Sequence, residues 1–344
     1  MNAVKPTMGN ARCVRVLCRA VLGAAALLCA PYAALAAGDY AQRDDVRQFI
    51  AEMAQRHGFA RKSLRAVFRQ VKYLPAIVRA MTPPAEAPVK SWQAYRALFV
   101  NRERVEAGQN FRARYGDALA RAERDFGVPG EIIVAIIGVE TLYGRNTGGY
   151  RVIDTLTTLA FDYPRRGEFF RDELEQFLVN ARESGVDVFS VRGSYAGAIG
   201  LPQFMPGSFT RYAVDYDGDG QRDLNLSAVD AIGSVANFLK AHGWQAQRPI
   251  AVSAQTSGDV YRELVDVGIK PLYRAEDLPA FGVNAAEPLP PHALCALIEL
   301  QTPGESPEYW VGLQNFYALT RYNRSSFYAA AVTELARAVS RGAP

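Results

Sequence analysis

The sequence predicts a mainly α fold of the α+β class, in which helices carry the core and a small β-containing segment is inserted. Apolar residues recur at intervals of three and four over residues 46–53 and again over 332–339, which is the spacing of one helix face. This period is lost from about residue 246 to 300, where short β-rich runs alternate with turns that contain proline and glycine. The 344-residue chain is 49% hydrophobic and 22% charged, as expected for a globular protein with two or three subdomains.

The N-terminal elements are predicted as helices in series. The first covers residues 40–57 and is followed by a glycine, which readily adopts the left-handed conformation found after helices. A second helix is predicted to be capped by Ser63 and to end before Pro75. The three prolines of residues 82–88 predict an extended connector, and residues 92–126 are again predicted to be helical.

The most apolar of the predicted helices ends in a glutamate. Ile133, Ile136, Ile137 and Glu140 share one helix face, and only the last of them is polar. A carboxyl group at the end of an apolar stripe loses solvent, which raises its pKa and suits it to act as a general acid. The alternative is a structural role, in which Glu140 caps a buried helix and pairs with an arginine such as Arg145.

A loop rich in small residues lies further along the chain. Residues 193–200 contain three glycines and two alanines, which allow another group to approach the backbone closely. We interpret it either as a close-packed turn or as a loop that lines a ligand site. The next helix, residues 228–239, is predicted to be capped by Ser227, and helix returns from Tyr309 after the β-containing segment.

An acidic segment beginning at Asp215 matches the start of an EF-hand loop. Asp215, Asp217 and Asp219 occupy positions one, three and five, and Gln221 at position seven can offer its carbonyl oxygen. The twelfth position holds leucine in place of glutamate, and Asp230 is the candidate for the missing ligand. The pattern predicts a structural Ca²⁺ site rather than a sensor. The alternative is an acidic surface turn.

Residues 1–36 are predicted to be a signal peptide that is removed on export. Four basic residues precede an apolar run, and Ala34-Leu35-Ala36 forms a cleavage site. A lipoprotein form through Cys29 is less favoured, because the bulky Leu28 stands where such sites carry a small residue. No stable membrane span is expected after cleavage.

The charge and the metal-binding residues of the remaining chain exclude several classes of function. Removing the four basic residues of the leader leaves 35 basic against 35 acidic residues, so no basic surface predicts nucleic-acid binding. Only Cys295 remains, which excludes an internal disulfide. His57, His242 and His292 are far apart in sequence, so no zinc site is expected. No motif supports a Ser-His-Asp or Cys-His hydrolase.

Several segments together resemble the B-type lytic murein transglycosylases, periplasmic enzymes that cut bacterial peptidoglycan. The matching residues, in the order of the family, are 127–144, 163–166, 193–206, the loop from 215, 231–237 and 317–328. The resemblance implies a lysozyme-like helical catalytic core with a flanking helical domain. The predicted domains are a helical domain over 37–118, the core with its EF-hand-like loop over 119–245, a β-containing domain over 246–300, and a C-terminal helical segment over 301–344 that completes the cleft.

The resemblance also implies a mechanism with Glu140 as the only acid/base and with no cofactor needed for the chemistry. The glutamate protonates the oxygen between N-acetylmuramic acid (MurNAc) and N-acetylglucosamine (GlcNAc), and then accepts the proton of the muramoyl C6 hydroxyl as a 1,6-anhydro ring closes. Ordinary glycosidases need two carboxyl groups. No second acid has an equally apolar setting here, since Asp154, Glu168, Asp172 and Glu173 are interpreted as helix caps and solvated faces.

The remaining site residues are carried over from the resemblance one at a time. Tyr95 resembles an aromatic residue that lines the sugar cleft, and Ser194 and Gln203 resemble polar groups near the acid. Arg165 and Arg166 resemble groups that face the carboxylates of the lactyl-peptide part of the substrate. The far wall of the cleft is expected to contain Tyr322, Asn323 and Tyr328. The alternatives are core tyrosines with satisfied hydroxyls and a solvated arginine pair.

The predicted function is therefore that of a periplasmic lytic transglycosylase whose partners are peptidoglycan glycan strands and, as candidates, cell-wall synthesis proteins. Two alternatives keep the same fold: a muramidase that uses water, and a non-catalytic peptidoglycan-binding protein. A calcium-buffering scaffold is less favoured, because one loop is a small part of the chain.

Overall fold

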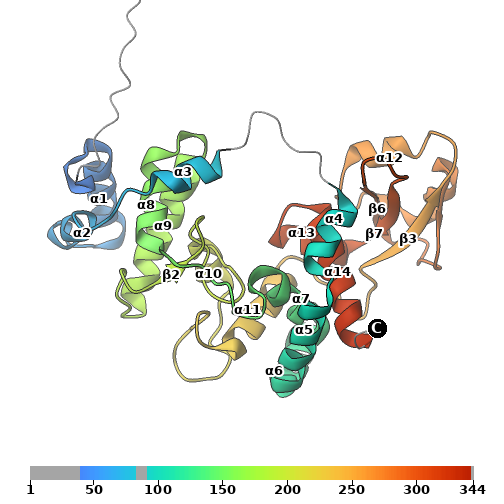
Figure 1. Ribbon diagram of the computed structural model, residues 1–344, viewed down its shortest axis with the longest axis horizontal. Coiled ribbons are helices and arrows are strands. Elements are labelled where there is room, and N and C mark those ends of the chain that lie inside the picture. Colours follow the sequence, from blue (N-terminus) through green and yellow to red (C-terminus); the bar gives the residue numbers. More distant parts are fainter. Residues whose placement is uncertain (1–38, 83–90, 342–344) are drawn as a thin grey trace, which may run out of the picture. The chain divides into compact units, whose positions relative to one another are not determined.

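The computed structural model describes residues 39–82 and 91–341. The predicted signal peptide and the prolines of the predicted connector lie outside the described residues. Within them, no helix combines the length and the apolar composition that a membrane crossing requires. The chain is mainly helical with one five-stranded sheet, which confirms the predicted fold class (Figure 1).

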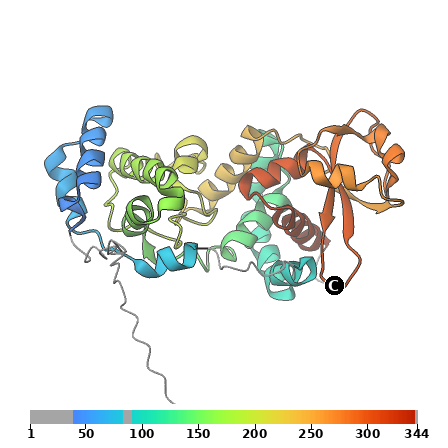
Figure 2. The ribbon, with the colours of Figure 1, turned by 90° about the horizontal axis from the view of Figure 1, so that it is seen from above.

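The first hydrophobic core is built on two helices from the middle of the sequence, α8 (Val152–Asp162) and α9 (Gly167–Glu183). The N-terminal helices contribute to the same core, and both views show α1 and α2 on the side of α8 and α9 (Figures 1 and 2). These N-terminal elements are η1 (Tyr40–Gln42), α1 (Asp44–His57), α2 (Arg61–Phe68) and α3 (Pro75–Met81). The predicted stripe of residues 46–53 faces this core, and Gly58 ends α1 with φ 70°, as expected.

Two predicted helix boundaries in this region are wrong. Ser63 does not cap α2, because that helix already begins at Arg61 with Ala60 at its N-cap. Pro75 does not follow directly on α2 but opens α3. A proline suits the first turn of a helix, where its missing N–H would have no intrahelical partner.

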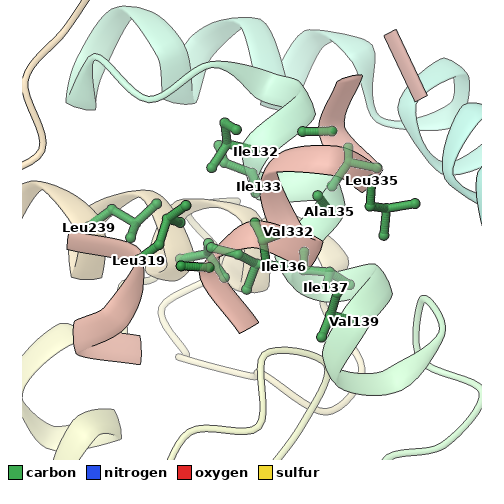
Figure 3. Close-up of a cluster of buried hydrophobic side chains, with 14 of the residues drawn as sticks. Ile132, Ile133, Ala135, Ile136, Ile137, Val139, Leu239, Leu319, Val332 and Leu335 are labelled. Carbon is green, nitrogen blue, oxygen red and sulfur yellow. The ribbon is translucent and has the colours of Figure 1, made fainter. Parts of the chain in front are cut away.

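The second hydrophobic core surrounds α7 (Gly130–Thr141), the helix that carries Glu140. Residues 132–139 of α7 are all buried, so the helix is apolar all round rather than along one stripe, as is typical of a central helix. Figure 3 shows its isoleucines among side chains from α11, α13 and α14. The surrounding helices are α4 (Trp92–Phe99), α5 (Arg102–Arg114), α6 (Gly116–Phe126), α11 (Ala228–Ala241), α13 (Gln314–Tyr322) and α14 (Ser326–Arg341).

Several short elements lie beside α8 and α9. The strands β1 (Tyr150–Arg151) and β2 (Arg192–Gly193) pair antiparallel on either side of α8 and α9 in the sequence. The helix α10 (Pro206–Tyr212) contacts both α9 and α11. The 3-10 turn η2 (Pro164–Arg166) joins α8 to α9.

The five-stranded sheet is antiparallel throughout, with the strand order β4-β6-β7-β3-β5. The strands are β3 (Ala251–Thr256), β4 (Tyr273–Arg274), β5 (Val283–Ala285), β6 (Leu294–Leu300) and β7 (Glu308–Gly312). A third apolar cluster covers the sheet together with α12 (Arg262–Val267) and η3 (Ala275–Phe281). The structure confirms that the predicted segment contains β-strands, but its predicted end at residue 300 is too early, because β7 lies beyond it.

The predicted domain boundaries do not coincide with the hydrophobic cores. Within 37–118, the helices up to Met81 pack with α8 and α9, whereas those from Trp92 onward pack with α7. The boundary at residue 300 separates β6 from β7, although the two strands pair along their length. Helix does not return at Tyr309, which lies in β7, but at Gln314. These contacts join segments far apart in sequence, which local patterns cannot show.

Candidate active site

Glu140 lies in the last turn of α7. It is partly exposed, whereas residues 132–139, which precede it in α7, are buried. Burial raises the pKa of its carboxyl group to about 7, from an ordinary value of 4.5. The hydroxyl of Tyr328 donates a hydrogen bond to Glu140 Oε1 over 2.8 Å, which partly opposes this rise by favouring the ionised form. Arg145 does not pair with Glu140 but with Glu103, over 3.0 Å. The structural alternative of a Glu140–Arg145 pair is therefore wrong.

Three tyrosines from three helices lie close enough to Glu140 for its charge to affect them. Tyr95 comes from α4, Tyr322 from α13 and Tyr328 from α14. Burial raises the pKa of all three hydroxyls, and the charge of Glu140 raises each further. The rings of Tyr322 and Tyr328 lie 6.2 Å apart and nearly parallel, at 11°. The carboxyl group thus has aromatic neighbours and a hydroxyl donor.

The three residues expected on the far wall have different surroundings. Tyr328 is 1% exposed and contacts the acid itself, so its position suits holding the carboxyl group rather than lining an open wall. Tyr322 is half-buried, and its hydroxyl donates to the carbonyl oxygen of Pro202 over 2.5 Å. Asn323 is exposed at the end of α13.

The loop of small residues is a close-packed turn. A Cβ atom at Gly197 would lie 2.5 Å from the side chain of Leu156, and one at Gly200 would lie 2.2 Å from the carbonyl oxygen of Leu224. Both glycines also have positive φ. The alternatives for this loop were a close-packed turn and a loop that lines a ligand site. At its glycines the structure shows the close-packed turn, and this turn orients the polar side chains of the loop.

Ser194 and Gln203 are both partly exposed and both hold the loop in shape. The hydroxyl of Ser194 accepts a hydrogen bond from the amide of Ala198 over 3.1 Å. The Gln203 Nε2 donates to the carbonyl oxygens of Thr147 (3.1 Å) and Gly200 (2.9 Å). Gln203 has φ 51°, an uncommon conformation for a residue with a side chain, which often marks a functional site.

Arg165 and Arg166 lie in η2, beside the first hydrophobic core. Both are exposed, and within residues 39–82 and 91–341 neither forms an ion pair. The guanidinium group of Arg166 lies 4.2 Å from the ring centroid of Phe169. The structure places the pair on a different core from that of Glu140, at a solvated surface.

Sequence reasoning missed two buried acids. Asp154 is 4% exposed, forms a salt bridge with Arg151 over 2.6 Å, and accepts a hydrogen bond from the amide of Lys72. Glu173 is 7% exposed and accepts from the amide of Gly207 over 2.7 Å, and burial raises its pKa. The interpretation of both as cap or solvated residues is wrong, because each is buried and accepts a hydrogen bond from the backbone of a distant segment, at Lys72 and at Gly207. Glu168 and Asp172 are on the outer part of α9.

The acidic loop brings together three of its five predicted metal ligands. Oxygen atoms of Asp215, Asp217 and Asp230 all lie within 4.8 Å of one another. Asp219 does not join this group and instead accepts a hydrogen bond from the amide of Gln221 over 2.8 Å. Three hard oxygen donors at this separation fit Ca²⁺, whose oxygen ligands lie at about 2.3–2.6 Å. Asp230 thus stands where a further carboxylate was expected, while the carboxylate of Asp219 stays outside the group.

Local hydrogen bonds shape this loop. Asp215 accepts from the amides of Gly218 (2.7 Å) and Gly220 (2.8 Å). Asp230 accepts from the amides of Tyr216 (2.7 Å) and Asp223 (2.8 Å). Ser227 caps α11, as predicted, by accepting from the amide of Asp230. The helix therefore anchors one ligand while the loop folds around it.

The fold and the site define a helical enzyme core in which one glutamate is desolvated beside tyrosine hydroxyls. Residues 41–337 match the family model described as the transglycosylase SLT domain. Because this match spans most of the chain, the protein belongs to the transglycosylase SLT domain family.

Known relatives agree with this assignment. The membrane-bound lytic murein transglycosylase B of Escherichia coli (strain K12) is 44% identical over 313 residues, which cover 88% of this chain and 84% of that protein. The solved structure of the catenated lytic transglycosylase SltB1 of Pseudomonas aeruginosa is 46% identical with a TM-score of 0.84, and the match covers 88% of this chain and 99% of that one. These similarities confirm the predicted lysozyme-like fold.

Two further solved structures hold ligands. The Escherichia coli lytic transglycosylase Slt35 in complex with calcium is 43% identical with a TM-score of 0.79, over 89% of this chain and 95% of that one. The Pseudomonas aeruginosa SltB3 in complex with NAG-anhNAM-pentapeptide is 33% identical with a TM-score of 0.75, over 87% of this chain and 79% of that one.

Proposed function

We propose that this protein is a lytic transglycosylase that cleaves the β-1,4 bond between MurNAc and GlcNAc in peptidoglycan, with Glu140 as the only acid/base. The single observation that carries the proposal is the desolvated carboxyl group of Glu140, whose pKa of about 7 leaves it substantially protonated near neutral pH. A general acid works best when its pKa lies near the working pH. The SltB3 structure with an anhydro-sugar ligand supports the same product class for this chain.

In the proposed reaction Glu140 first donates its proton to the glycosidic oxygen, and the bond from muramoyl C1 to that oxygen breaks. The carboxylate then accepts the proton of the muramoyl C6 hydroxyl, while O6 bonds to C1 and closes the 1,6-anhydro ring. The two proton transfers balance at one residue, so no water is consumed. Tyr328 supports both steps, since its hydroxyl stabilises the carboxylate formed between them.

The other site residues are proposed to bind the glycan strand. Tyr95 and Tyr322 offer ring surface and hydroxyl groups suited to sugars. Ser194, Gln203 and Asn323 are proposed to contact polar groups of the strand. Arg165 and Arg166 are proposed to face the carboxylates of the peptide stem, for which exposed guanidinium groups are suited.

The buried acids Asp154 and Glu173 do not favour the alternative of a hydrolytic muramidase. A second catalytic carboxyl group has to face the substrate beside the first. Asp154 is paired with Arg151, and Glu173 accepts the amide of Gly207 at the start of α10. Both are thus engaged in contacts that hold the fold, which supports the proposal that Glu140 acts without a second carboxyl group.

Mass spectrometry of digested peptidoglycan sacculi separates the two reactions. A lytic transglycosylase releases muropeptides with 1,6-anhydro-MurNAc ends, which are lighter by one water than the products of hydrolysis. We expect anhydro ends as the dominant product. Muropeptides with reducing MurNAc ends would support the muramidase, and sacculus binding without soluble products would support a non-catalytic binding protein.

We further propose that Asp215, Asp217 and Asp230 hold a structural Ca²⁺, for which the calcium complex of Slt35 is the supporting relative. The ion would neutralise the crowded carboxylates and fix the loop before α11. Residues 1–36 are proposed to export the protein to the periplasm. N-terminal sequencing of the protein recovered from the periplasm tests this export, with Ala37 expected as the first residue.

A further inference from the structure

Thr141 follows Glu140 directly and is buried, at 1% exposed. Its hydroxyl donates to the carbonyl oxygen of Leu201 over 2.9 Å, which is nearer than the alternative acceptor in its own helix, the carbonyl oxygen of Ile137 at 3.2 Å. The same hydroxyl accepts a hydrogen bond from the amide of Gly144 over 3.0 Å. One side chain thus joins the end of α7, the turn after it, and the loop that carries Gln203. The sequence gives one hint of this role, a threonine directly after Glu140 at the end of a mostly apolar helix.

The turn after Thr141 is conformationally strained. Leu142 and Tyr143 both have positive φ, 51° and 59°, which costs free energy for residues with side chains and requires support from the surrounding structure. The amide of Asn146 donates to the carbonyl oxygen of Thr141 over 2.9 Å, so the chain reverses within a few residues. The hydroxyl of Tyr143 donates to the carbonyl oxygen of Arg104. Glu140 is therefore attached to a turn whose shape depends on specific contacts.

The loop on the other side of the Thr141 contact is itself fixed. The amide of Leu201 donates to the carbonyl oxygen of Leu224 over 2.8 Å. That close approach leaves no room for a side chain at Gly200. Leu224 follows Asp223, whose amide donates to Asp230 in the acidic loop. Thr141 therefore connects the catalytic helix to a rigid neighbour.

We propose that Thr141 is a positioning residue for Glu140. Its hydroxyl fixes the strained turn to the loop of residues 200–203 and so holds the Glu140 carboxyl group at hydrogen-bond distance from the Tyr328 hydroxyl. Thr141 does not itself contact substrate. This inference rests on the proposed function of Glu140, because it concerns how that acid is held during the reaction.

The test compares Thr141→Val, which keeps the shape of the side chain but loses both hydrogen bonds, with Thr141→Ser, which keeps the hydroxyl. The matched control is Thr333→Val on α14. Thr333 is 2% exposed, and among the residues that the structure describes its hydroxyl bonds only within its own helix, to the carbonyl oxygen of Ala329 over 2.8 Å. Initial rates on soluble glycan strands give kcat and KM for each variant, and circular dichroism establishes that each is folded at the assay temperature.

We expect Thr141→Val to lower kcat by about 10-fold or more with KM within about 2-fold, because small displacements of a catalytic group cost rate more than binding. Thr141→Ser should recover most of the loss, and Thr333→Val should leave kcat within about 2-fold of the wild type. The proposal is overturned if Thr141→Val matches Thr333→Val in kcat, or if the serine variant is as slow as the valine variant.

If Thr141→Val does not fold, the test compares Thr141→Cys with Thr141→Ser instead. Thr141→Cys has nearly the size of the serine variant but a much weaker hydrogen bond. The serine variant should then be the faster of the two, and equal rates would overturn the proposal. Absence of anhydro products from the wild type would instead refute the proposed function, so the two failures are distinguishable.

Discussion

The hydroxyl of Tyr328 and the carboxyl group of Glu140 are joined by a 2.8 Å hydrogen bond between residues 188 positions apart in the sequence. The C-terminal helix α14 therefore completes the surroundings of an acid carried by α7. Tyr328 is buried and held by packing, so the bond has a fixed direction. This relationship makes the protonation of the acid depend on a residue that the sequence alone does not place next to it.

Replacing Tyr328 by phenylalanine should lower kcat while moving the alkaline limb of the pH profile to higher pH. The hydroxyl favours the ionised carboxyl group, so its loss raises the pKa of Glu140 further. The loss in kcat should be about 10-fold, the scale of one charge-assisted hydrogen bond. Tyr317→Phe, which removes a partly exposed hydroxyl on α13, is the control. A limb that moves to lower pH would contradict this account.

The pH dependence of the wild-type enzyme follows from the pKa of about 7 at Glu140. The first step needs the protonated acid, so kcat/KM should be level at mildly acidic pH and fall above about pH 7. Rates on soluble glycan strands between pH 5 and 9, with folding checked by circular dichroism at each pH, measure the limb. A fall in activity already complete near pH 5, as for an ordinary solvated glutamate, would show that the carboxyl group is not desolvated.

Glu140→Gln should stabilise the fold increasingly as pH rises from about 4.5 to 7. Below this window the carboxyl group is protonated in both states. Within it the unfolded chain ionises while the folded chain does not, so the wild type loses stability, by at most ~3 kcal/mol, and the full loss remains above pH 7. Urea unfolding at pH 4, 6 and 8 measures the difference. The exposed Glu183→Gln should show no such trend, and a constant difference for Glu140→Gln would contradict the prediction.

Calcium should raise the melting temperature of the wild type but not of Asp215→Asn. The substitution removes one charged ligand from the group of Asp215, Asp217 and Asp230. Ligand that binds only the folded state stabilises it by mass action, so the shift should grow with Ca²⁺ concentration. Asp259→Asn, on an exposed surface outside the loop, should respond like the wild type. No saturable heat on titration of metal-free wild type with Ca²⁺ would remove the site.

Local sequence patterns predicted the helix that carries Glu140 well, and they predicted the surroundings of Glu140 poorly. The run from Ile132 to Val139 is apolar enough to identify a buried helix, and Glu140 stands out at its end. The partner Tyr328 has no such signal, since its contact with the acid depends on how α14 packs against α7. The resemblance to a family predicted Tyr328 on the far wall of the cleft, but it did not predict the hydrogen bond from Tyr328 to Glu140.

The errors have the same physical origin. Asp154 has the sequence features of a helix cap, yet it is buried because the amide of Lys72 and the side chain of Arg151 satisfy its oxygens. Glu173 lies among charged neighbours in the sequence, yet α10 covers it. In both cases contacts with distant segments decide whether the carboxyl group is buried, and the helical period of the sequence does not predict such contacts. In the acidic loop, by contrast, the spacing of the aspartates was enough to suggest Asp230 as a substitute ligand.

The most direct test of the single-acid account is turnover by Glu140→Gln on purified sacculi, beside Glu173→Gln as a matched change at another buried glutamate. We predict that Glu140→Gln still binds sacculi but loses soluble anhydro-muropeptide release by at least about 10²–10⁴-fold, the scale of general acid catalysis, while Glu173→Gln retains it. Undiminished release by Glu140→Gln would contradict the account.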